Sequence, residues 1–328
     1  MSRKYRWGII GLGKIAEKFA EGLQVLPDAQ LYAVASRTQQ KADDFAQRFS
    51  VPNAFGNYRD MLSNRNIDII YIATPHTRHY ENTMMCLEAG YPVLCEKPFA
   101  INSFEVKKMI SKSREKGILL MEAMWTAFLP SIKKIKSVIN EGVIGKVELV
   151  RADFGIHPYS DPKNRWFNIE LGGGSLLDVG IYPAYIALEI LGRPEEIKAL
   201  ASIGATGVDE NCGFVFQYKG GEMASLYSSI IAKTGIDAMI TGSKGAIHIH
   251  SNFFMPSNVS AIFENTEQDI TPEYIGNGYN YEAAEAMECL DKGLIESISM
   301  NHEKSMLLME ILDKIRKECN IRYPKHDD

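Results

Sequence analysis

Trp7-Gly-Ile-Ile10 leads directly into Gly11-Leu-Gly-Lys-Ile-Ala16, and this stretch decides how the first part of the chain folds. The apolar residues before the turn predict a buried strand, and the spacing of apolar residues over Ile15–Leu26 predicts a helix. A G-x-G-x-x-A sequence between a strand and a helix is typical of a turn that binds a dinucleotide. The motif is weak evidence alone, but here it has the structural context it needs.

Each small residue of this turn has a physical reason. Gly11 permits a tight turn, Gly13 lets the backbone approach a pyrophosphate, and Ala16 lets the helix pack closely on the strand. The first N–H groups of the helix and its dipole attract the phosphates. We therefore expect cofactor contacts from Gly11, Leu12, Gly13, Lys14 and Ile15.

Apolar runs continue to alternate with helical stretches through about residue 125. Strands are expected at Leu31–Ala35, Ile67–Ala73, Tyr91–Cys95 and Leu119–Glu122, and helices at Gln39–Phe49, His79–Ala89 and Ser103–Lys116. Strands that alternate with helices of this length predict βαβ units and a parallel sheet. We expect an α/β protein whose residues 1–126 form a Rossmann domain with a doubly wound parallel sheet.

The pattern changes after Phe128. A helix at Ser131–Glu141 precedes longer segments in which apolar and polar residues alternate, among them Lys146–Phe154 and Ile197–Ile203. Such alternation is typical of an antiparallel sheet with one covered face. We expect residues 127–328 to form an α+β domain for substrate binding and dimerisation, with a large, mostly antiparallel open sheet.

The composition fits a globular protein and excludes several partners. The chain has 328 residues, of which 45% are hydrophobic, and a net charge of -5, which does not suit a protein that coats nucleic acid or an anionic membrane. No apolar run approaches the roughly 20 residues of a membrane span, and we expect no signal peptide. The five cysteines are widely spaced and predict neither disulfides nor a zinc knuckle. We expect a cytoplasmic protein.

The end of the second strand predicts the form of the nucleotide. An enzyme that prefers NAD usually carries Asp or Glu there, which binds the ribose 2′-hydroxyl. This chain has Ser36-Arg37, with Lys41 one helical turn further on. A hydroxyl and two cationic side chains suit a 2′-phosphate, and we expect NADP to bind these three residues. The alternative is that Arg37 is only a solvated surface charge.

Two further segments carry candidate catalytic groups. Lys97, in Cys95-Glu-Lys-Pro98, follows the fourth strand, and ligands of such sheets bind at the carboxyl ends of strands. Asp178 and Tyr182 follow the glycines of Leu171-Gly-Gly-Gly-Ser at a spacing that places both on one helical face. A phenol near an ammonium group titrates below its usual pKa of about 10 and can handle a proton. Taken in isolation, this pair could also be a core tyrosine with a capping aspartate.

These motifs together resemble the Gfo/Idh/MocA oxidoreductase family over nearly the whole chain. Ala73-Thr-Pro75, Glu96-Lys-Pro98 and Gly172–Pro183 follow the glycine turn in the family's order and spacing. Many members carry His where this chain has Tyr182. The tyrosine, together with Met121-Glu-Ala-Met-Trp125 and Asn164-Arg-Trp-Phe-Asn168, is similar to the branch of dimeric dihydrodiol dehydrogenases and NADP-linked D-xylose dehydrogenases.

The resemblance implies roles for individual residues. Lys97, Asp178 and Tyr182 would be catalytic. Thr74, Pro75, His76, His79 and Glu96 would contact the cofactor with Lys97, and the substrate pocket would be lined by Trp125, Phe154, Arg165 and Trp166. The expected reaction is hydride transfer between NADP and a substrate with vicinal hydroxyls, either an aldose such as D-xylose or a trans-dihydrodiol. The resemblance also implies a homodimer formed through the C-terminal sheet.

Two other functions remain open on the sequence alone. A non-catalytic regulator that senses NADP would use the same fold, although it need not keep both Lys97 and Tyr182. A nicotinamide-dependent glycosidase would borrow the hydride and return it. We expect no metal: His76 and His79, and likewise His248 and His250, lie close in sequence, but no nearby carboxylate or cysteine completes a ligand set.

Overall fold

The computed structural model describes residues 4–158, 164–264 and 266–327, which form two compact units. Unit 1 comprises Met1–Phe128 and Ile275–Met306, and unit 2 comprises Leu129–Tyr274 and Leu307–Asp328. The division differs from the expected one because Ile275–Met306, which we had assigned to the second domain, groups with the first. This segment carries α8 (Tyr279–Asp291), which packs against α1 (Lys14–Leu23) of the Rossmann fold.

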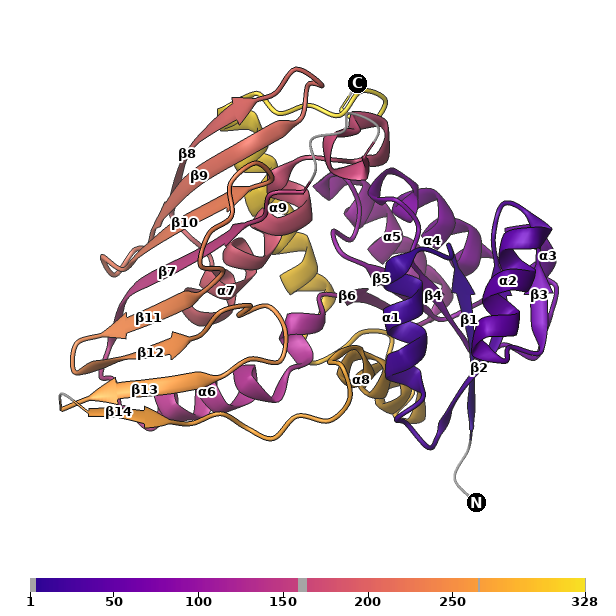
Figure 1. Ribbon diagram of the computed structural model, residues 1–328, viewed down its shortest axis with the longest axis horizontal. Helices are drawn as coiled ribbons and strands as arrows, with labels where there is room; N and C mark the ends of the chain where they lie inside the picture. The colour runs from indigo at the N-terminus through magenta and orange to yellow at the C-terminus, as the bar shows by residue number, and fades with distance from the viewer. Residues whose placement is uncertain (1–3, 159–163, 265, 328) are drawn as a thin grey trace. The chain divides into compact units, whose positions relative to one another are not determined.

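Unit 1 is built on a parallel sheet of six strands in the order β3-β2-β1-β4-β5-β6 (Figure 1). The strands are β1 (Tyr5–Ile10), β2 (Ala29–Ala35), β3 (Asn53–Phe55), β4 (Ile69–Ile72), β5 (Val93–Glu96) and β6 (Leu120–Ala123). The connecting helices are α1, α2 (Gln39–Phe49), α3 (Tyr58–Leu62), α4 (His79–Glu88) and α5 (Ser103–Lys116), with short 3-10 turns η1 (His76–Arg78) and η2 (Trp125–Phe128). The expected Rossmann fold is confirmed.

The strand order places the nucleotide site. The order reverses between β1 and β4, and ligands of doubly wound sheets bind at this switch point, outside the carboxyl ends of the strands. All residues of β4, β5 and β6 are buried, which explains why these strands are apolar apart from Glu96 and Glu122. The sequence did not reveal β3 and α3, because three and five residues are too few to show a period.

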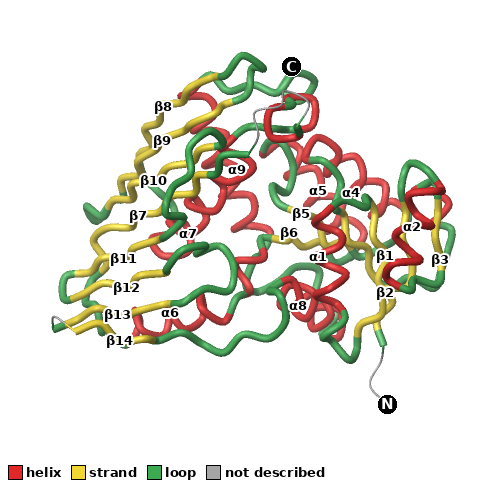
Figure 2. Tube along the Cα trace, viewed as in Figure 1, coloured by secondary structure: helices red, strands yellow, loops and turns green. Residues whose placement is uncertain are grey.

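Unit 2 contains an eight-stranded sheet in the order β14-β13-β12-β11-β7-β10-β9-β8, drawn as neighbouring yellow strands in Figure 2. All neighbours are antiparallel except β7 and β10, so the predicted mostly antiparallel sheet is confirmed. The strands are β7 (Val147–Gly155), β8 (Glu196–Ile203), β9 (Asp209–Gln217), β10 (Met223–Ser229), β11 (Ala238–Gly242), β12 (Gly245–Ile249), β13 (Val259–Phe263) and β14 (Thr266–Asp269). The remaining helices are α6 (Pro130–Asn140), α7 (Ile181–Leu191) and α9 (His302–Cys319).

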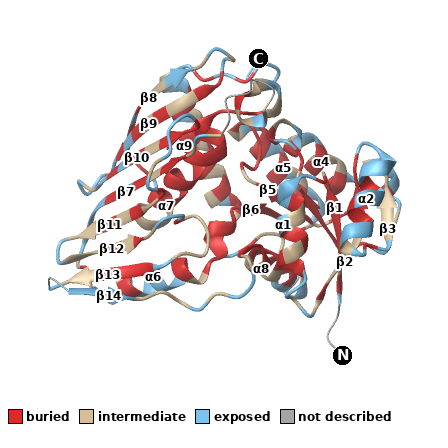
Figure 3. Cartoon of the chain, viewed as in Figure 1, coloured by how far each residue is buried: buried red, intermediate tan, exposed pale blue. Residues whose placement is uncertain are grey.

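The two faces of this sheet differ in burial (Figure 3). Alternate residues of β8 and β10, such as Ile197 and Leu226, are buried, and α7 packs on β7 and β10. The residues between them point outward, and Leu200 is 84% exposed there. We call this second side the outward face of the sheet.

The stretch Ile169–Leu191 is more apolar than we expected from the sequence. By length and composition, Ile169–Leu191 is long and apolar enough to cross a membrane, contrary to our expectation that no run approaches this length. However, 83% of its most apolar 18 residues are buried inside the protein. Every residue from Ile181 to Leu188 is buried in α7, so core packing accounts for this hydropathy.

Candidate functional site

The glycine turn joins β1 to α1 at the carboxyl end of β1. Gly11 has φ +89, and a Cβ there would lie 2.8 Å from both the Ala73 carbonyl oxygen and Thr74 Cγ2. Both the backbone conformation and the close approach of the segment after β4 therefore require glycine. Leu12 is buried beneath the turn, whereas Lys14 and Ile15 are exposed at the start of α1.

Gly13 differs from Gly11 because the fold itself does not require it. Gly13 is the N-cap of α1 with φ -98, a conformation open to any residue, and a Cβ there would meet no atom within 4 Å. Because glycine has no side chain that could cap α1, it is a poorer choice for helix stability here than Ser or Asp. A glycine at the mouth of a helix N-terminus fits a site where a phosphate approaches the backbone. The residues present thus suit a dinucleotide.

The end of β2 places the three predicted 2′-phosphate residues around the start of α2. Ser36 is buried, and Arg37 and Lys41 are exposed. The first turn of α2 contains no acidic residue. Burial raises the pKa of the nearby Tyr58 hydroxyl, and the charge of Arg37 partly offsets this effect, which places the guanidinium near that phenol.

Thr74, Pro75 and His76 follow β4, and Thr74 and His76 are buried. His79 is fully buried, and its Nδ1 lies 2.7 Å from the Pro98 carbonyl oxygen while its Nε2 lies 2.8 Å from the Thr74 carbonyl oxygen. Both ring nitrogens are thus used to join the loops that follow β4 and β5. His79 therefore links the loops that carry Thr74 and Lys97, and its expected contact with the cofactor stays a prediction.

Glu96 ends β5 within a buried acidic cluster that the sequence did not predict. The Tyr71 hydroxyl donates to Glu96 Oε1. Glu282 of α8 is fully buried nearby, and burial, followed by the charge of Glu96, raises the pKa of Glu282 well above its ordinary value. Glu282 lies almost 190 residues beyond Glu96, so only the return of Ile275–Met306 to unit 1 brings the two carboxyl groups together.

Lys97 follows directly and precedes a cis peptide bond to Pro98. Glu122 of β6, buried to 1% exposure, accepts a hydrogen bond from the Phe99 N–H at 3.1 Å. Burial raises the pKa of Glu122 to about 7, opposed by hydrogen bonds from Ser305 and Phe99, with smaller opposite effects of Glu96 and Lys97. Glu122 therefore holds the loop that presents Lys97.

In unit 2, Asp178 lies in the π-helical turn Leu176–Gly180 and is 1% exposed. Arg165 approaches it with both guanidinium arms, at 2.8 Å from Oδ2 and 3.0 Å from Oδ1. The Arg165 guanidinium also lies 4.2 Å from the centre of the Trp166 ring. Arg165, expected only as a pocket residue, is thus the bidentate partner of the predicted catalytic carboxylate, and such a fork fixes its orientation.

The glycines before Asp178 make this pairing possible. A Cβ at Gly173 would lie 2.6 Å from the carbonyl oxygens of both Arg165 and Trp166, and Gly174 has φ +123. Asp209, fully buried, accepts hydrogen bonds from the Ser175 hydroxyl at 2.8 Å and the Leu176 N–H at 2.7 Å. The glycine segment therefore lets the loop of Arg165 lie directly against the turn of Asp178.

Tyr182 begins α7 and is 6% exposed. Its ring centre lies 5.5 Å from that of Phe154 on β7 and 5.0 Å from that of Phe254, and the two phenylalanine rings are 4.4 Å apart. The structure thus brings together Tyr182 and the predicted pocket residue Phe154. It adds Phe254 to this aromatic cluster.

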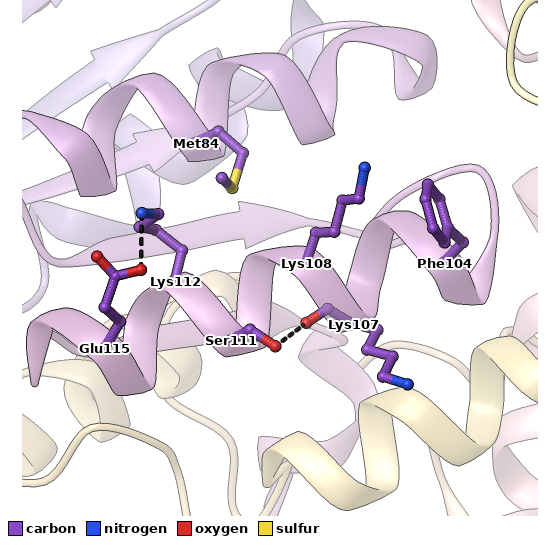
Figure 4. Close-up of a pocket in the computed structure, with 7 residues that line it drawn as sticks. All are labelled: Met84, Phe104, Lys107, Lys108, Ser111, Lys112 and Glu115. Carbon is purple, nitrogen blue, oxygen red and sulfur yellow. Dashed lines mark hydrogen bonds and ion pairs between the residues drawn. The ribbon is translucent and has the colours of Figure 1, made fainter.

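The remaining predicted residues lie in separate units. Trp125 belongs to unit 1, where its ring stacks on Tyr279 at 4.3 Å. Lys97 also belongs to unit 1, and Asp178 and Tyr182 belong to unit 2. A surface groove of about 420 Å³ between α4 and α5 is lined by other residues (Figure 4), namely Met84, Phe104, Lys107, Lys108, Ser111, Lys112 and Glu115.

Comparison with known proteins agrees with the folds of the two units. Residues 5–124 match the model of an oxidoreductase family with an NAD-binding Rossmann fold, and residues 132–248 match the GFO/IDH/MocA C-terminal domain. Trans-1,2-dihydrobenzene-1,2-diol dehydrogenase of Mus musculus is 37% identical over 332 residues, covering 98% of both chains. The Homo sapiens protein of the same name is 34% identical over 330 residues, again covering 98% of both chains.

Solved structures share the fold. The aldose-aldose oxidoreductase of Caulobacter crescentus has a TM-score of 0.89 at 23% identity and covers 97% of this chain and 98% of its own. The 3-ketoreductase KijD10 of Actinomadura kijaniata, solved with TDP-benzene and NADP, has a TM-score of 0.86 at 24% identity with the same coverage. The two family matches and the full-length relatives lead to one conclusion: this chain belongs to the Gfo/Idh/MocA family of oxidoreductases.

Proposed function

We propose that this chain is an NADP-dependent dehydrogenase that oxidises one hydroxyl of a vicinal pair. A trans-dihydrodiol is the first candidate substrate, and an aldose such as D-xylose is the second. The observation that carries this proposal is the Tyr182 phenol, held in an aromatic cluster in the unit that also holds the Arg165–Asp178 pair. The relatives named for trans-dihydrobenzenediol support the first substrate.

Each catalytic side chain has a distinct task. Tyr182 takes the proton of the substrate hydroxyl, and Lys97 contributes a positive charge to the reaction. Asp178 orients the substrate, with its carboxylate fixed by Arg165. Bound NADP would supply the acceptor for the hydride of the carbinol carbon. Trp166 and Phe154 border the substrate, and the apolar ring of a dihydrodiol suits the aromatic surface of Phe154 and Phe254.

We assign the nucleotide to unit 1. Residues Gly11–Ile15 hold the pyrophosphate, and Ser36, Arg37 and Lys41 hold the 2′-phosphate. Thr74, Pro75, His76 and Glu96 flank the nicotinamide and its ribose. A preference for NADP over NAD is supported by the cationic start of α2 and the absence of acidic residues in its first turn.

The cofactor preference has a direct test. Arg37→Ala is expected to weaken NADP binding at least tenfold, since a hydrogen bond to a charged group contributes about 1.5–3 kcal/mol, while NAD binding stays unchanged. Arg48→Ala on the same helix, whose guanidinium pairs with Glu17 at 2.9 Å, is the matched control. Equal effects of Arg37→Ala on both nucleotides would contradict the assignment.

The activity test follows NADPH formation with trans-dihydrodiols, aldoses and polyols. Tyr182→Phe is expected to lower kcat by about 100- to 10,000-fold with little change in NADP affinity. Tyr185→Phe, which removes a hydroxyl three residues further along α7, is the control and should keep turnover. Full turnover of Tyr182→Phe would exclude its role in proton transfer. Tight NADP binding without any reduction would favour a sensor, and hydrolysis without net reduction would favour a glycosidase.

We further propose a homodimer formed through the outward face of the eight-stranded sheet. Strand register places the side chains of Leu149, Leu200, Val215 and Met223 on this face, and they are 40%, 84%, 37% and 43% exposed. Apolar side chains gathered on one exposed face are typical of an interface. We assign the protein to the cytoplasm, which suits five cysteines that form no disulfide.

A further inference from the structure

We propose that His248, His250 and Glu267 form a binding site for a transition-metal ion of the zinc type, at the β12–β14 edge of the eight-stranded sheet. Each side chain offers one ligand atom, and these atoms all lie within 4.8 Å of one another. The sequence suggested no metal because no carboxylate lies near the two histidines in the chain. Glu267 reaches them because β13 returns the chain antiparallel to β12 and β14 follows beside β13 (Figure 1).

The two imidazoles are close enough to act as a pair. His248 lies in β12 and His250 directly follows this strand, so the two side chains are on the same face of the sheet. Their ring centres are 4.1 Å apart. His250 Nε2 lies 3.7 Å from Glu267 Oε1, which places a carboxylate oxygen beside the imidazole pair.

Neighbouring residues support the proposed ligands. Asp237 Oδ2 lies 2.9 Å from His248 Nε2, and the Arg151 guanidinium holds the same carboxylate at 2.9 Å. A carboxylate on one ring nitrogen orients an imidazole so that its other nitrogen can bind a metal. His250 Nε2 lies 2.7 Å from the Oγ of Ser260, a residue that is 7% exposed. These contacts fix the two rings on the outward face of the sheet.

The donor set selects the class of ion. Two imidazoles with one carboxylate suit zinc and its neighbours in the first transition series, whereas Mg²⁺ and Ca²⁺ prefer oxygen ligands alone. Zinc binds nitrogen and oxygen at about 2.0–2.2 Å, so tetrahedral ligand atoms lie roughly 3.3 Å apart. The side chain of Glu267 is 56% exposed, and it can rotate to close the remaining distance.

Such an ion would have a structural consequence. β14 is a four-residue edge strand, and every one of its residues is exposed. A metal held by β14 on one side and by the His248–His250 segment on the other would link the edge to the interior of the sheet. An ion that binds only the folded chain also raises its stability in proportion to its occupancy.

The test is calorimetric titration of the full-length, tag-free, EDTA-treated protein with ZnCl₂, with MgCl₂ in parallel. We expect one Zn²⁺ per chain, a higher Tm in its presence, and the visible absorption of tetrahedral Co²⁺ when Co²⁺ replaces zinc. His250→Gln and Glu267→Gln should abolish this stoichiometric binding, and Asp237→Asn should weaken it by about 10- to 100-fold. The exposed His157, outside the cluster, gives the control His157→Gln, which should bind as the unmodified chain does.

Three results would overturn the assignment. The first is an unmodified chain that binds no Zn²⁺ at stoichiometric concentration. The second is Zn²⁺ binding that survives both His250→Gln and Glu267→Gln. The third is Mg²⁺ binding with equal affinity, which would indicate carboxylates without the histidines. The activity of the enzyme enters none of these readouts, so they are independent of the proposed function.

Discussion

The difference between Gly11 and Gly13 gives a prediction that separates folding from nucleotide binding. At Gly13 an added methyl group would meet no atom within 4 Å, and φ is -98. Gly13→Ala should therefore destabilise the fold only through the weaker N-cap, by at most about 1 kcal/mol. Gly13→Asp should preserve or improve the cap, since aspartate is among the preferred N-cap residues.

The effect on NADP should be much larger. A carboxylate about 4 Å from a phosphate charge is unfavourable by about 1 kcal/mol in water and about 4 kcal/mol at a protein surface. With two phosphate charges, Gly13→Asp should raise the Kd of NADP at least tenfold. Isothermal titration measures this Kd, and urea unfolding without nucleotide measures stability.

Gly11→Ala is the matched comparison. Its φ of +89 and the 2.8 Å approach to the Ala73 carbonyl oxygen predict a stability loss of at least about 1–2 kcal/mol before any nucleotide is added. A folded Gly13→Asp variant that binds NADP with the original Kd would refute the phosphate site. A Gly13→Ala variant that is destabilised as strongly as Gly11→Ala would show instead that the fold itself requires Gly13.

Three further outcomes are expected. In the folded state the pKa of Glu122 is raised from 4.5 to about 7, so ionisation of Glu122 lowers the stability of the fold as pH rises between these values. Glu122→Gln keeps an acceptor for the Phe99 N–H, and its stability relative to the original chain should rise by up to about 3 kcal/mol between pH 4.5 and 8 in urea unfolding. A pH-independent difference would contradict this. Arg165→Met removes the guanidinium that contacts both oxygens of the buried Asp178, and should lower the free energy of unfolding by about 1–3 kcal/mol, measured by thermal unfolding. Adding Asp178→Asn should recover part of this stability, and strictly additive losses would show that the two side chains are not coupled. Met223→Glu on the outward face should convert the proposed dimer to a monomer in light scattering, whereas Lys134→Glu on the exposed side of α6 should leave it unchanged. A persistent dimer in Met223→Glu would move the interface elsewhere.

Local patterns predicted the Rossmann fold because its determinants are local. The glycine turn, the buried strands and helices such as Gln39–Phe49 and Ser103–Lys116 are found where the sequence places them. Each depends on spacing within about 15 residues, which the chain displays directly. The alternation of apolar residues likewise predicted the open sheet of unit 2.

Contacts between distant segments escaped prediction for the same reason. Nothing near Glu96 in the chain points to Glu282, and nothing near His250 points to Glu267. Arg165 was expected to line a pocket, but the close approach at Gly173 places it on Asp178. The sequence suggested a cofactor contact for His79, and only the fold shows that its ring lies between two backbone carbonyls and links the loops after β4 and β5.

Sequence patterns were enough to predict the class of nucleotide site, because the glycine turn and the helix N-terminus are adjacent in the chain and Ser36 and Arg37 follow the next strand. They also indicated Lys97, Asp178 and Tyr182 as candidates for the chemistry. The groups that surround these residues became known from the fold alone. Carboxylate pairs, guanidinium forks and cross-strand histidine sites depend on distances of a few ångströms between segments far apart in sequence, and the folding of the whole chain sets those distances.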